Sequence, residues 1–276
     1  VLNKKTLGVA VSESPTGPFV ASSKPLFTSS NAGQMIDSDV FTDPVSKQSY
    51  LYYGNGKLCY RLLSDDMMSV KGNEYTITPI GGTLSDYAFR EGVHVFYRNG
   101  IYYFMWSVDD TGSANYHVAY GTSTSPVGPI TIAEQPVVLI QDPTNEIYGT
   151  GHHSVVNVPG SDDWYIVYHR INKNYLHNGP GTHREVCVDK LTFDESGHIN
   201  KVTPTRKGID PVDMDDFIRQ ITDVNTINNA DATAVSIAYY TVDGIKLGSS
   251  EPDKAGLYIR RELLSNGLVR SFKMLK

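Results

Sequence analysis

Residues 90–107, which decide the fold, read REGVHVFYRNGIYYFMWS. Residues 94–97 alternate as a strand would and run into Arg98-Asn99-Gly100. An Asn-Gly pair between β-forming segments is a strong short-range signal for a hairpin. Residues 101–106 are aromatic and apolar, which is typical of a buried strand. The stretch therefore predicts a β-hairpin, with Glu91 at the mouth of its first strand as either a solvated turn residue or a catalytic acid.

The aromatic strand of this hairpin recurs along the chain. Related segments read SYLYYG at 49–54, IYYFMW at 101–106 and WYIVYH at 164–169, at spacings of 52 and 63 residues. A second repeat, SESPTGPF at 12–19, returns as STSPVGPI at 123–130. Repeats of about 40 to 60 residues that are rich in β-formers and lack helices indicate a β-propeller with one four-stranded blade per repeat. A β-sandwich with accidental similarity is the alternative.

The composition excludes several classes of protein. The 276 residues carry a formal net charge of −6, which gives no reason to expect nucleic acid as a partner. No run of apolar residues is long enough to span a bilayer. The length suits one large domain and a small one. Cys59 and Cys187 lie in apolar, strand-like segments, so we predict buried thiols.

Four polar residues fall where the innermost strands of a propeller would begin: Asp37, Glu91, His152 and Arg184. The first three are 54 and 61 residues apart, which matches the repeat spacing. Because inner strands line the central channel, their starts should meet on one face. Two carboxyl groups, an imidazole and a guanidinium above one channel suit inverting glycoside hydrolysis, in which one carboxyl protonates the leaving oxygen and another activates water. Trp106 is either a platform for a bound sugar or part of the core.

Four motifs occur in order at the repeat spacing: MIDSDVF at 35–41, Glu91-Gly92, GTGHHSVV at 149–156 and HREVCVD at 183–189. Together they resemble glycoside hydrolase family 43, and the resemblance covers residues 1–210. It implies an all-β, five-bladed β-propeller. It also implies an inverting glycosidase, an α-L-arabinofuranosidase or β-xylosidase, that acts on arabinan, arabinoxylan or xylan of plant cell walls.

The resemblance further implies a role for each matched residue. Glu91 matches the general acid, and Asp37 matches the carboxylate that orients this acid and favours its protonated form. Arg184 matches an arginine that contacts the sugar. His152 matches a channel histidine that lies at the substrate and in some members holds a calcium ion, directly or through water. No other cofactor is implied, and the expected partner is a plant polysaccharide or oligosaccharide.

The start of the chain departs from the family pattern. The family's general base is an aspartate at the beginning of the first blade, and residues 1–19 offer only Glu13, in a Ser-Pro turn, as a poor substitute. We therefore interpret the N-terminus as a truncation, with the first blade largely missing and the general base in the missing segment. A non-catalytic carbohydrate-binding propeller is the alternative function.

The character of the sequence changes after the partial propeller of residues 1–210. Residues 211–233 are polar and acidic and predict a linker, with Pro211–Ile221 as a short candidate helix. Residues 234–276 predict a small β module with an Asp-Gly hairpin turn. The KAGLYI segment at 254–259 and the final basic strand resemble the C-terminal sorting module of type IX secretion substrates. A small accessory β-domain is the alternative, and both predict a secreted or cell-surface protein.

Overall fold

The computed structural model describes residues 5–80, 87–176, 183–212, 233–242, 244–265 and 269–276. The chain divides into two compact units, Val1–Ile209 and Asp210–Lys276. Among the described residues, regular structure is strand apart from two short 3-10 helices, η1 (Pro143–Asn145) and η2 (Lys173–Tyr175). Neither is long or apolar enough to cross a membrane. The prediction of an all-β fold is confirmed.

The predicted hairpin lies at the centre of the first unit. β8 (Glu91–Arg98) pairs antiparallel with β9 (Ile101–Val108), and Arg98 faces Ile101 across the turn. Asn99 and Gly100 have φ angles of 49° and 88°, the left-handed values that a two-residue hairpin turn requires. Because Asn and Gly tolerate this region better than other residues, the local sequence sets the register of the two strands.

The hairpin belongs to a five-stranded sheet. β10 (His117–Ser123) pairs with β9, and β11 (Ile130–Leu139) pairs with β10. The short β7 (Pro79–Ile80) then adds a parallel pairing at the outer edge of β11. A two-residue strand carries no periodic signal, so the sequence does not predict this edge.

Two other sheets repeat the pattern, and a two-stranded sheet precedes them. The two-stranded sheet contains β1 (Ala10–Val11) and β2 (Val20–Ala21). The next sheet contains β3 (Asp39–Thr42), β4 (Ser49–Tyr53), β5 (Leu58–Leu63) and β6 (Val70–Ile77). The last sheet of this unit contains β12 (Ser154–Asn157), β13 (Trp164–Ile171) and β14 (Arg184–Leu191). The three aromatic repeats of the sequence form β4, β9 and β13, each next to the first strand of its sheet. Cys59 in β5 and Cys187 in β14 are buried free thiols, as predicted.

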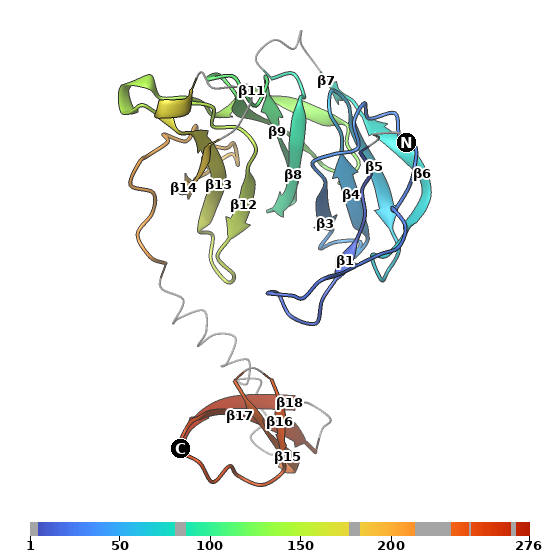
Figure 1. Cartoon of the computed structure of the whole chain (residues 1–276), viewed down its shortest axis with the longest axis vertical. Coiled ribbons are helices and arrows are strands. Elements are labelled where there is room, and N and C mark those ends of the chain that lie inside the picture. The colour runs from blue at the N-terminus through green and yellow to red at the C-terminus, as the bar shows by residue number, and fades with distance from the viewer. Residues whose placement is uncertain (1–4, 81–86, 177–182, 213–232, 243, 266–268) are drawn as a thin grey trace. The chain divides into compact units, whose positions relative to one another are not determined.

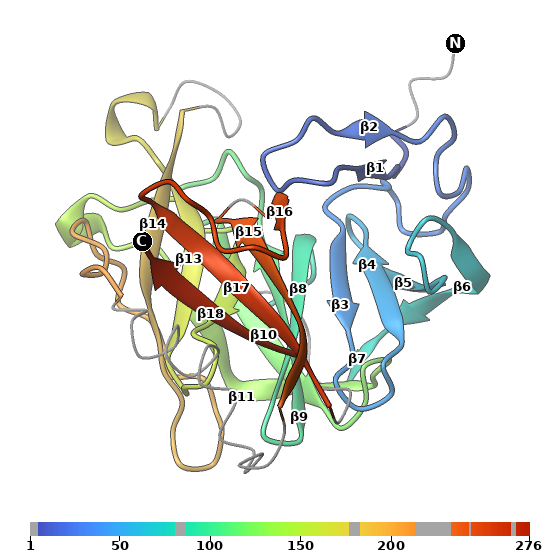
Figure 2. The same cartoon turned by 90° about the horizontal axis from the view of Figure 1, so that it is seen from below.

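The three larger sheets are arranged as neighbouring blades. Figure 1 shows their first strands, β3, β8 and β12, side by side. In the view of Figure 2, β3 again lies beside β8, and β4, β5 and β6 follow outward. Aromatic rings fill the space between blades: Tyr52 meets Phe104 edge-on at 5.8 Å, and Phe96 packs on Trp164 at 5.1 Å between ring centroids. This is propeller packing, and the count of five blades stays a prediction.

The second unit contains one antiparallel sheet in the order β16-β15-β17-β18. Its strands are β15 (Ala234–Thr241), β16 (Lys246–Gly248), β17 (Leu257–Leu264) and β18 (Val269–Leu275). Tyr239 and Leu264 are buried within it. Residues 213–232, which hold most of the predicted linker and helix, lie outside the described residues, and so does Asp243 of the predicted turn.

Candidate active site

A β-bulge aims Glu91 at the start of β8. Glu91 faces Ser107 of β9 but His94 faces Met105, so β8 contains one extra residue between these two pairs. Gly92 within the bulge has a φ of 62°, and a Cβ there would lie 3.1 Å from Ser107 Oγ. Glycine therefore permits both the left-handed backbone and the close approach. Bulges of this kind re-aim a neighbouring side chain, here Glu91.

The carboxyl group of Glu91 is held at both oxygens. Its residue is 9% exposed. Tyr116 donates its hydroxyl to Oε1 at 3.0 Å, and the Asn55 side-chain amide donates to Oε2 at 2.6 Å. Asn55 reaches this point because the N–H of the next residue, Gly56, donates to the Arg90 carbonyl at 2.7 Å. The β4–β5 turn thus lies against the start of β8 and fixes the orientation of Glu91.

Asp37 lies within electrostatic reach of Glu91 and of the two predicted cationic residues. It precedes β3 by two residues and has a φ of 55°. Burial raises the pKa of Asp37 above its ordinary value; the charge of His152 opposes this shift, and the negative charge of Glu91 adds to it. Arg184 also acts to lower the pKa of Asp37. Charges act on one another through space, so Glu91, His152 and Arg184 lie within electrostatic reach of Asp37.

His152 lies in the loop before β12 and connects this loop to the β8 bulge. The residue is half-buried with a φ of 48°, and its backbone N–H donates to Ser107 Oγ at 2.9 Å. A Cβ placed on Gly92 would lie 3.2 Å from His152 Nδ1, so the ring stands directly over the bulge. Arg184, at the first position of β14, is exposed. These placements put an imidazole and a guanidinium beside the two carboxyl groups.

Two further histidines lie buried around this site, and both are held neutral. Burial lowers the pKa of His169 to about 4, with the charges of Arg184 and His152 acting in the same direction. The pKa of His153 is also lowered well below its usual range, mainly by burial. Among the described residues, no group hydrogen-bonds to either nitrogen of either ring. The His169 ring stacks on Tyr116 at 5.7 Å and 23°.

The predicted calcium site finds little support in the side chains. The described residues contain no group of three or more His, Cys, Asp or Glu side chains placed to hold a metal ion. Calcium takes six to eight ligands and prefers oxygen, whereas His152 offers nitrogen and both Glu91 oxygens already accept hydrogen bonds. The described side chains alone therefore do not form a calcium-binding site.

Asp39 has a structural role two residues after Asp37. Its Oδ2 accepts the backbone N–H of Val95 at 2.9 Å, and its Oδ1 lies 3.2 Å from His94 Nδ1. These contacts join β3 to β8, the inner strands of two neighbouring blades. Asp39 and His94 therefore hold the strands that carry the site.

Trp106 requires a correction. It was a candidate sugar platform, but the residue is 1% exposed and its indole N–H donates to the Tyr87 carbonyl at 2.8 Å. A platform for a sugar needs an accessible ring face. Trp106 instead packs in the core between the first two large sheets.

Three residues around Glu91 were not among the predicted site residues: Asn55, Ser107 and Tyr116. Asn55 belongs to an ordinary Asn-Gly turn, and Tyr116 precedes β10 in a loop without periodicity. The plain register of the hairpin would place Ser107 opposite Gly92, and only the bulge places it opposite Glu91. Their importance depends on contacts between loops of different blades, which single-sequence patterns do not encode.

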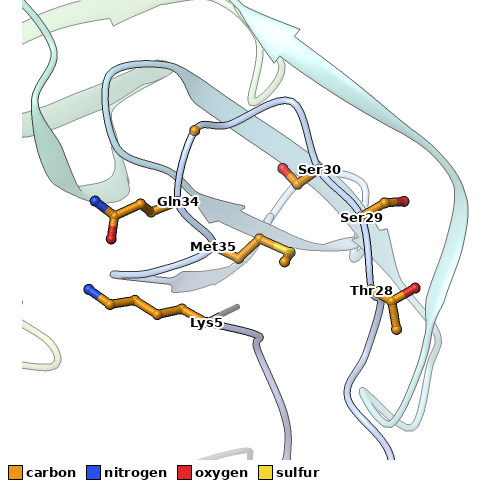
Figure 3. Close-up of a pocket in the computed structure, with 7 residues that line it drawn as sticks. Lys5, Thr28, Ser29, Ser30, Gln34 and Met35 are labelled. Atoms are coloured by element: carbon orange, nitrogen blue, oxygen red, sulfur yellow. The ribbon is translucent and has the colours of Figure 1, made fainter. Parts of the chain in front are cut away.

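A polar cavity of about 430 Å³ adjoins the segment that carries Asp37. It is lined by Lys5, Thr28, Ser29, Ser30, Gly33, Gln34 and Met35. Figure 3 shows the amino group of Lys5 and the amide of Gln34 on the same side of this space. Lys5 acts on Asp37 as well, because its positive charge lowers the pKa of that carboxyl.

Comparisons with known proteins show the family of this chain. Residues 1–199 match the family model for glycosyl hydrolases family 43. Beta-D-galactofuranosidase xynD of Aspergillus niger is 35% identical over 209 residues, which cover 74% of this chain and 57% of that protein. A xylosidase/arabinosidase of Bacteroides ovatus is 28% identical, over 70% of this chain and 64% of that protein. The chain thus spans less than two thirds of the length of these relatives.

Solved structures show the same likeness. A thermostable family-43 glycoside hydrolase superposes with a TM-score of 0.63 at 27% identity, covering 74% of this chain and 68% of that one. CoXyl43, a GH43 beta-xylosidase/alpha-arabinofuranosidase from a compost microbial metagenome, superposes with a TM-score of 0.57 at 27% identity, covering 71% of this chain and 65% of that one. The CoXyl43 structure is in complex with xylotriose and in a calcium-free form.

Proposed function

The chain belongs to glycosyl hydrolases family 43, and from this premise we propose that it hydrolyses glycosidic bonds in plant cell-wall polysaccharide with inversion at the anomeric carbon. The proposed substrates are terminal arabinofuranose or xylose residues of arabinan, arabinoxylan or xylan. The observation that carries the proposal is the arrangement around the β8 bulge, where the Glu91 carboxyl lies within electrostatic reach of Asp37. Two carboxyl groups in one polar site suit this reaction class.

Glu91 is the proposed general acid. In a single displacement its carboxyl proton passes to the glycosidic oxygen as the bond between that oxygen and the anomeric carbon breaks, while water activated by the general base bonds to this carbon from the opposite face. Glu91 is left as a carboxylate. Asn55 and Tyr116, which donate to its two oxygens, support that negative charge as it forms. Burial of the residue keeps bulk water from competing for these hydrogen bonds.

Asp37 is proposed to orient the Glu91 acid and to influence its protonation, and it is not proposed as the acid itself. Its carboxyl group lies within electrostatic reach of Glu91, which is the position that this role requires. An inverting enzyme also needs a carboxylate on the other side of the sugar to activate water. We propose that this general base comes from a segment of the whole protein outside these 276 residues, in agreement with the length of the relatives.

Arg184 and His152 are proposed to contact the sugar. Both carry hydrogen-bond donors and both influence Asp37, so a sugar bound over Asp37 and Glu91 would meet them.

The test is hydrolysis of nitrophenyl glycosides by the whole protein. We expect release from the α-L-arabinofuranoside or the β-xyloside, with inverted product observed by NMR. The β-galactofuranoside belongs in the panel because one relative is a galactofuranosidase. Binding to arabinoxylan without hydrolysis of any glycoside would favour the alternative, a carbohydrate-binding propeller. Turnover by residues 1–276 alone would show that the base lies within them.

The second unit is proposed to direct the protein out of the cell through the type IX secretion machinery. The proposal is supported by the resemblance of residues 254–259 and by the separate antiparallel sheet, whose strand β17 begins at Leu257 within this segment. Fusion of residues 210–276 to a reporter protein in a bacterium with this machinery should place the reporter outside the cell. A reporter that stays inside and binds polysaccharide in vitro would favour an accessory sugar-binding domain.

A further inference from the structure

We infer that Tyr116 and Ser107 form a hydrogen-bonded chain that positions Glu91 and supports its charge during proton transfer, and that Gly151 exists to admit the Tyr116 ring. The inference rests on the proposed function of Glu91 as the acid. Tyr116 and Ser107 are positioning residues here, because they act through Glu91 and are not placed against the substrate.

When Glu91 is a carboxylate, the chain of hydrogen bonds runs in one direction. The backbone N–H of His152, which can only donate, is given to Ser107 Oγ at 2.9 Å. The Ser107 hydroxyl hydrogen-bonds the Tyr116 hydroxyl, and this bond acts to lower the pKa of Tyr116. Such an effect is that of a donor to the phenol oxygen. Tyr116 in turn donates to Glu91 Oε1 at 3.0 Å. Donation thus runs from the His152 backbone to the carboxylate.

Burial keeps the Tyr116 hydroxyl protonated and shielded from solvent. Both Tyr116 and Ser107 are 0% exposed. Burial is the main cause that raises the pKa of Tyr116 far above its ordinary value, and the nearby charge of Glu91 adds to the shift. The phenol therefore keeps its proton at neutral pH and can donate to Glu91. A donor of this kind, shielded from water, stabilises a developing negative charge more strongly than an exposed one.

The Tyr116 ring contacts two groups from the blade of β12, β13 and β14. It stacks on the buried His169. It also lies against Gly151, where an added Cβ would fall 2.3 Å from the ring atoms Cδ1 and Cε1. No side chain fits there unless the ring moves away. The glycine that precedes His152 therefore has a steric purpose, which is to let the ring lie beneath this loop with its hydroxyl at Glu91.

The two partners of Glu91 differ in what they can do. The Asn55 NH2 group can only donate, so it holds Oε2 in one way throughout the reaction. The Tyr116 hydroxyl can donate or accept, so it can turn to accept from a protonated Oε1 and return to donate when Glu91 becomes a carboxylate. Its hydrogen bond is therefore strongest when the acid has lost its proton. Interactions that strengthen toward the transition state raise kcat.

The kinetic test is Tyr116→Phe in the whole protein, since it keeps the ring and removes only the hydroxyl. On an arabino- or xylo-oligosaccharide, kcat should fall by about 10- to 100-fold, the scale of one hydrogen bond to a charged group, with KM little changed. Dinitrophenyl glycosides, which need less protonation, should lose less. Tyr120→Phe is the matched control: Tyr120 is also buried, and its hydroxyl accepts the Ile199 N–H away from the site. Its kcat ratio between the two substrates should equal that of the unmodified protein.

Gly151→Ala tests the hydrogen bond between Tyr116 and Glu91 in an independent way. The added methyl should displace the ring and produce a similar loss of kcat on oligosaccharides. Because both changes break one hydrogen bond, the double variant should lose little more than either single variant. Fully additive losses, or equal losses on both substrate types for Tyr116→Phe, would overturn the inference.

A spectroscopic test separates this inference from the proposed function. The chain is labelled with carboxyl-13C glutamate, and the Glu91 signal is identified by its loss in Glu91→Gln. Tyr116→Phe should shift this signal in the folded protein, whereas Tyr120→Phe should not. An unshifted signal would refute the hydrogen bond even in an active enzyme. A shifted signal in a protein that cleaves no glycoside would uphold the contact and reject the proposed function.

Discussion

The buried histidine behind Tyr116 predicts a specific loss of stability in acid. The proposed change is His169→Phe, which keeps an aromatic ring against Tyr116 and removes the titrating group. Burial lowers the pKa of His169 from 6.5 to about 4 in the folded protein. Protonation is therefore easier in the unfolded chain, and unfolding takes up a proton in acid. The stability that depends on neutral His169 is present above pH 6.5 and is lost as the pH falls from 6.5 toward 4.

The size of the effect follows from linkage. With the two values above, the unmodified protein should lose about 2 kcal/mol of unfolding free energy at pH 5 and about 3 kcal/mol at pH 4 through this one group. The variant lacks this loss. Other groups, including the buried His153, titrate in both proteins, so their contributions cancel in the difference.

The assay is urea unfolding at pH 7, 6, 5 and 4, followed by tryptophan fluorescence. Both tryptophans, Trp106 and Trp164, are buried in the first unit and report on its unfolding. Tyr120→Phe is the control, because Tyr120 is a buried aromatic residue whose pKa is raised by burial and which does not titrate between pH 4 and 7, so its pH dependence should follow the unmodified protein. If His169→Phe shows the same decline in acid as the unmodified protein, burial does not hold His169 neutral and the reasoning fails.

Four other predictions concern the site and its support. Glu91→Gln should keep the fold and lower kcat by at least ~100-fold on substrates with poor leaving groups, with less effect on activated aryl glycosides; equal loss on both would indicate a binding role. Asp37→Asn removes a negative charge beside Glu91, so the basic limb of the pH–rate profile should move to lower pH; an unchanged profile with weaker binding would contradict this role. Asp39→Ala breaks the contact between β3 and β8 and should lower the unfolding free energy by roughly 1–3 kcal/mol, while an unchanged urea midpoint would show that the strands hold without it. Trp106→Phe should lower stability and leave KM unchanged, and a raised KM would restore its place as a sugar platform.

The strands were predictable because their signals are local. The Asn99-Gly100 turn and the recurrence of one aromatic strand pattern predict β4, β8, β9 and β13 at nearly their observed positions. Repeat spacing then predicts that the starts of inner strands from different blades meet. The electrostatic coupling of Asp37 with Glu91 and His152 agrees with that expectation.

The surroundings of Glu91 were not predictable, for physical reasons. The bulge at Gly92 changes the register by one residue, and a glycine in a strand pattern does not reveal which side chain it re-aims. Tyr116 approaches Glu91 only because Gly151 of another blade makes room for its ring. Trp106 was ambiguous because a large aromatic residue in a strand suits a core and a sugar platform equally well until its exposure is known.

The left-handed backbone at Asp37 and His152 has a consequence for how such a site can change during evolution. Most side chains with a Cβ lose about 1–2 kcal/mol in this conformation, and Asn, Asp and Gly lose least. Few residue types are therefore tolerated at these two positions, whichever sugar is bound. Arg184 starts an extended strand, where nearly every residue type fits the backbone. New sugar preferences should accordingly arise by replacement of Arg184, while Asp37 and His152 remain within a small set of residue types.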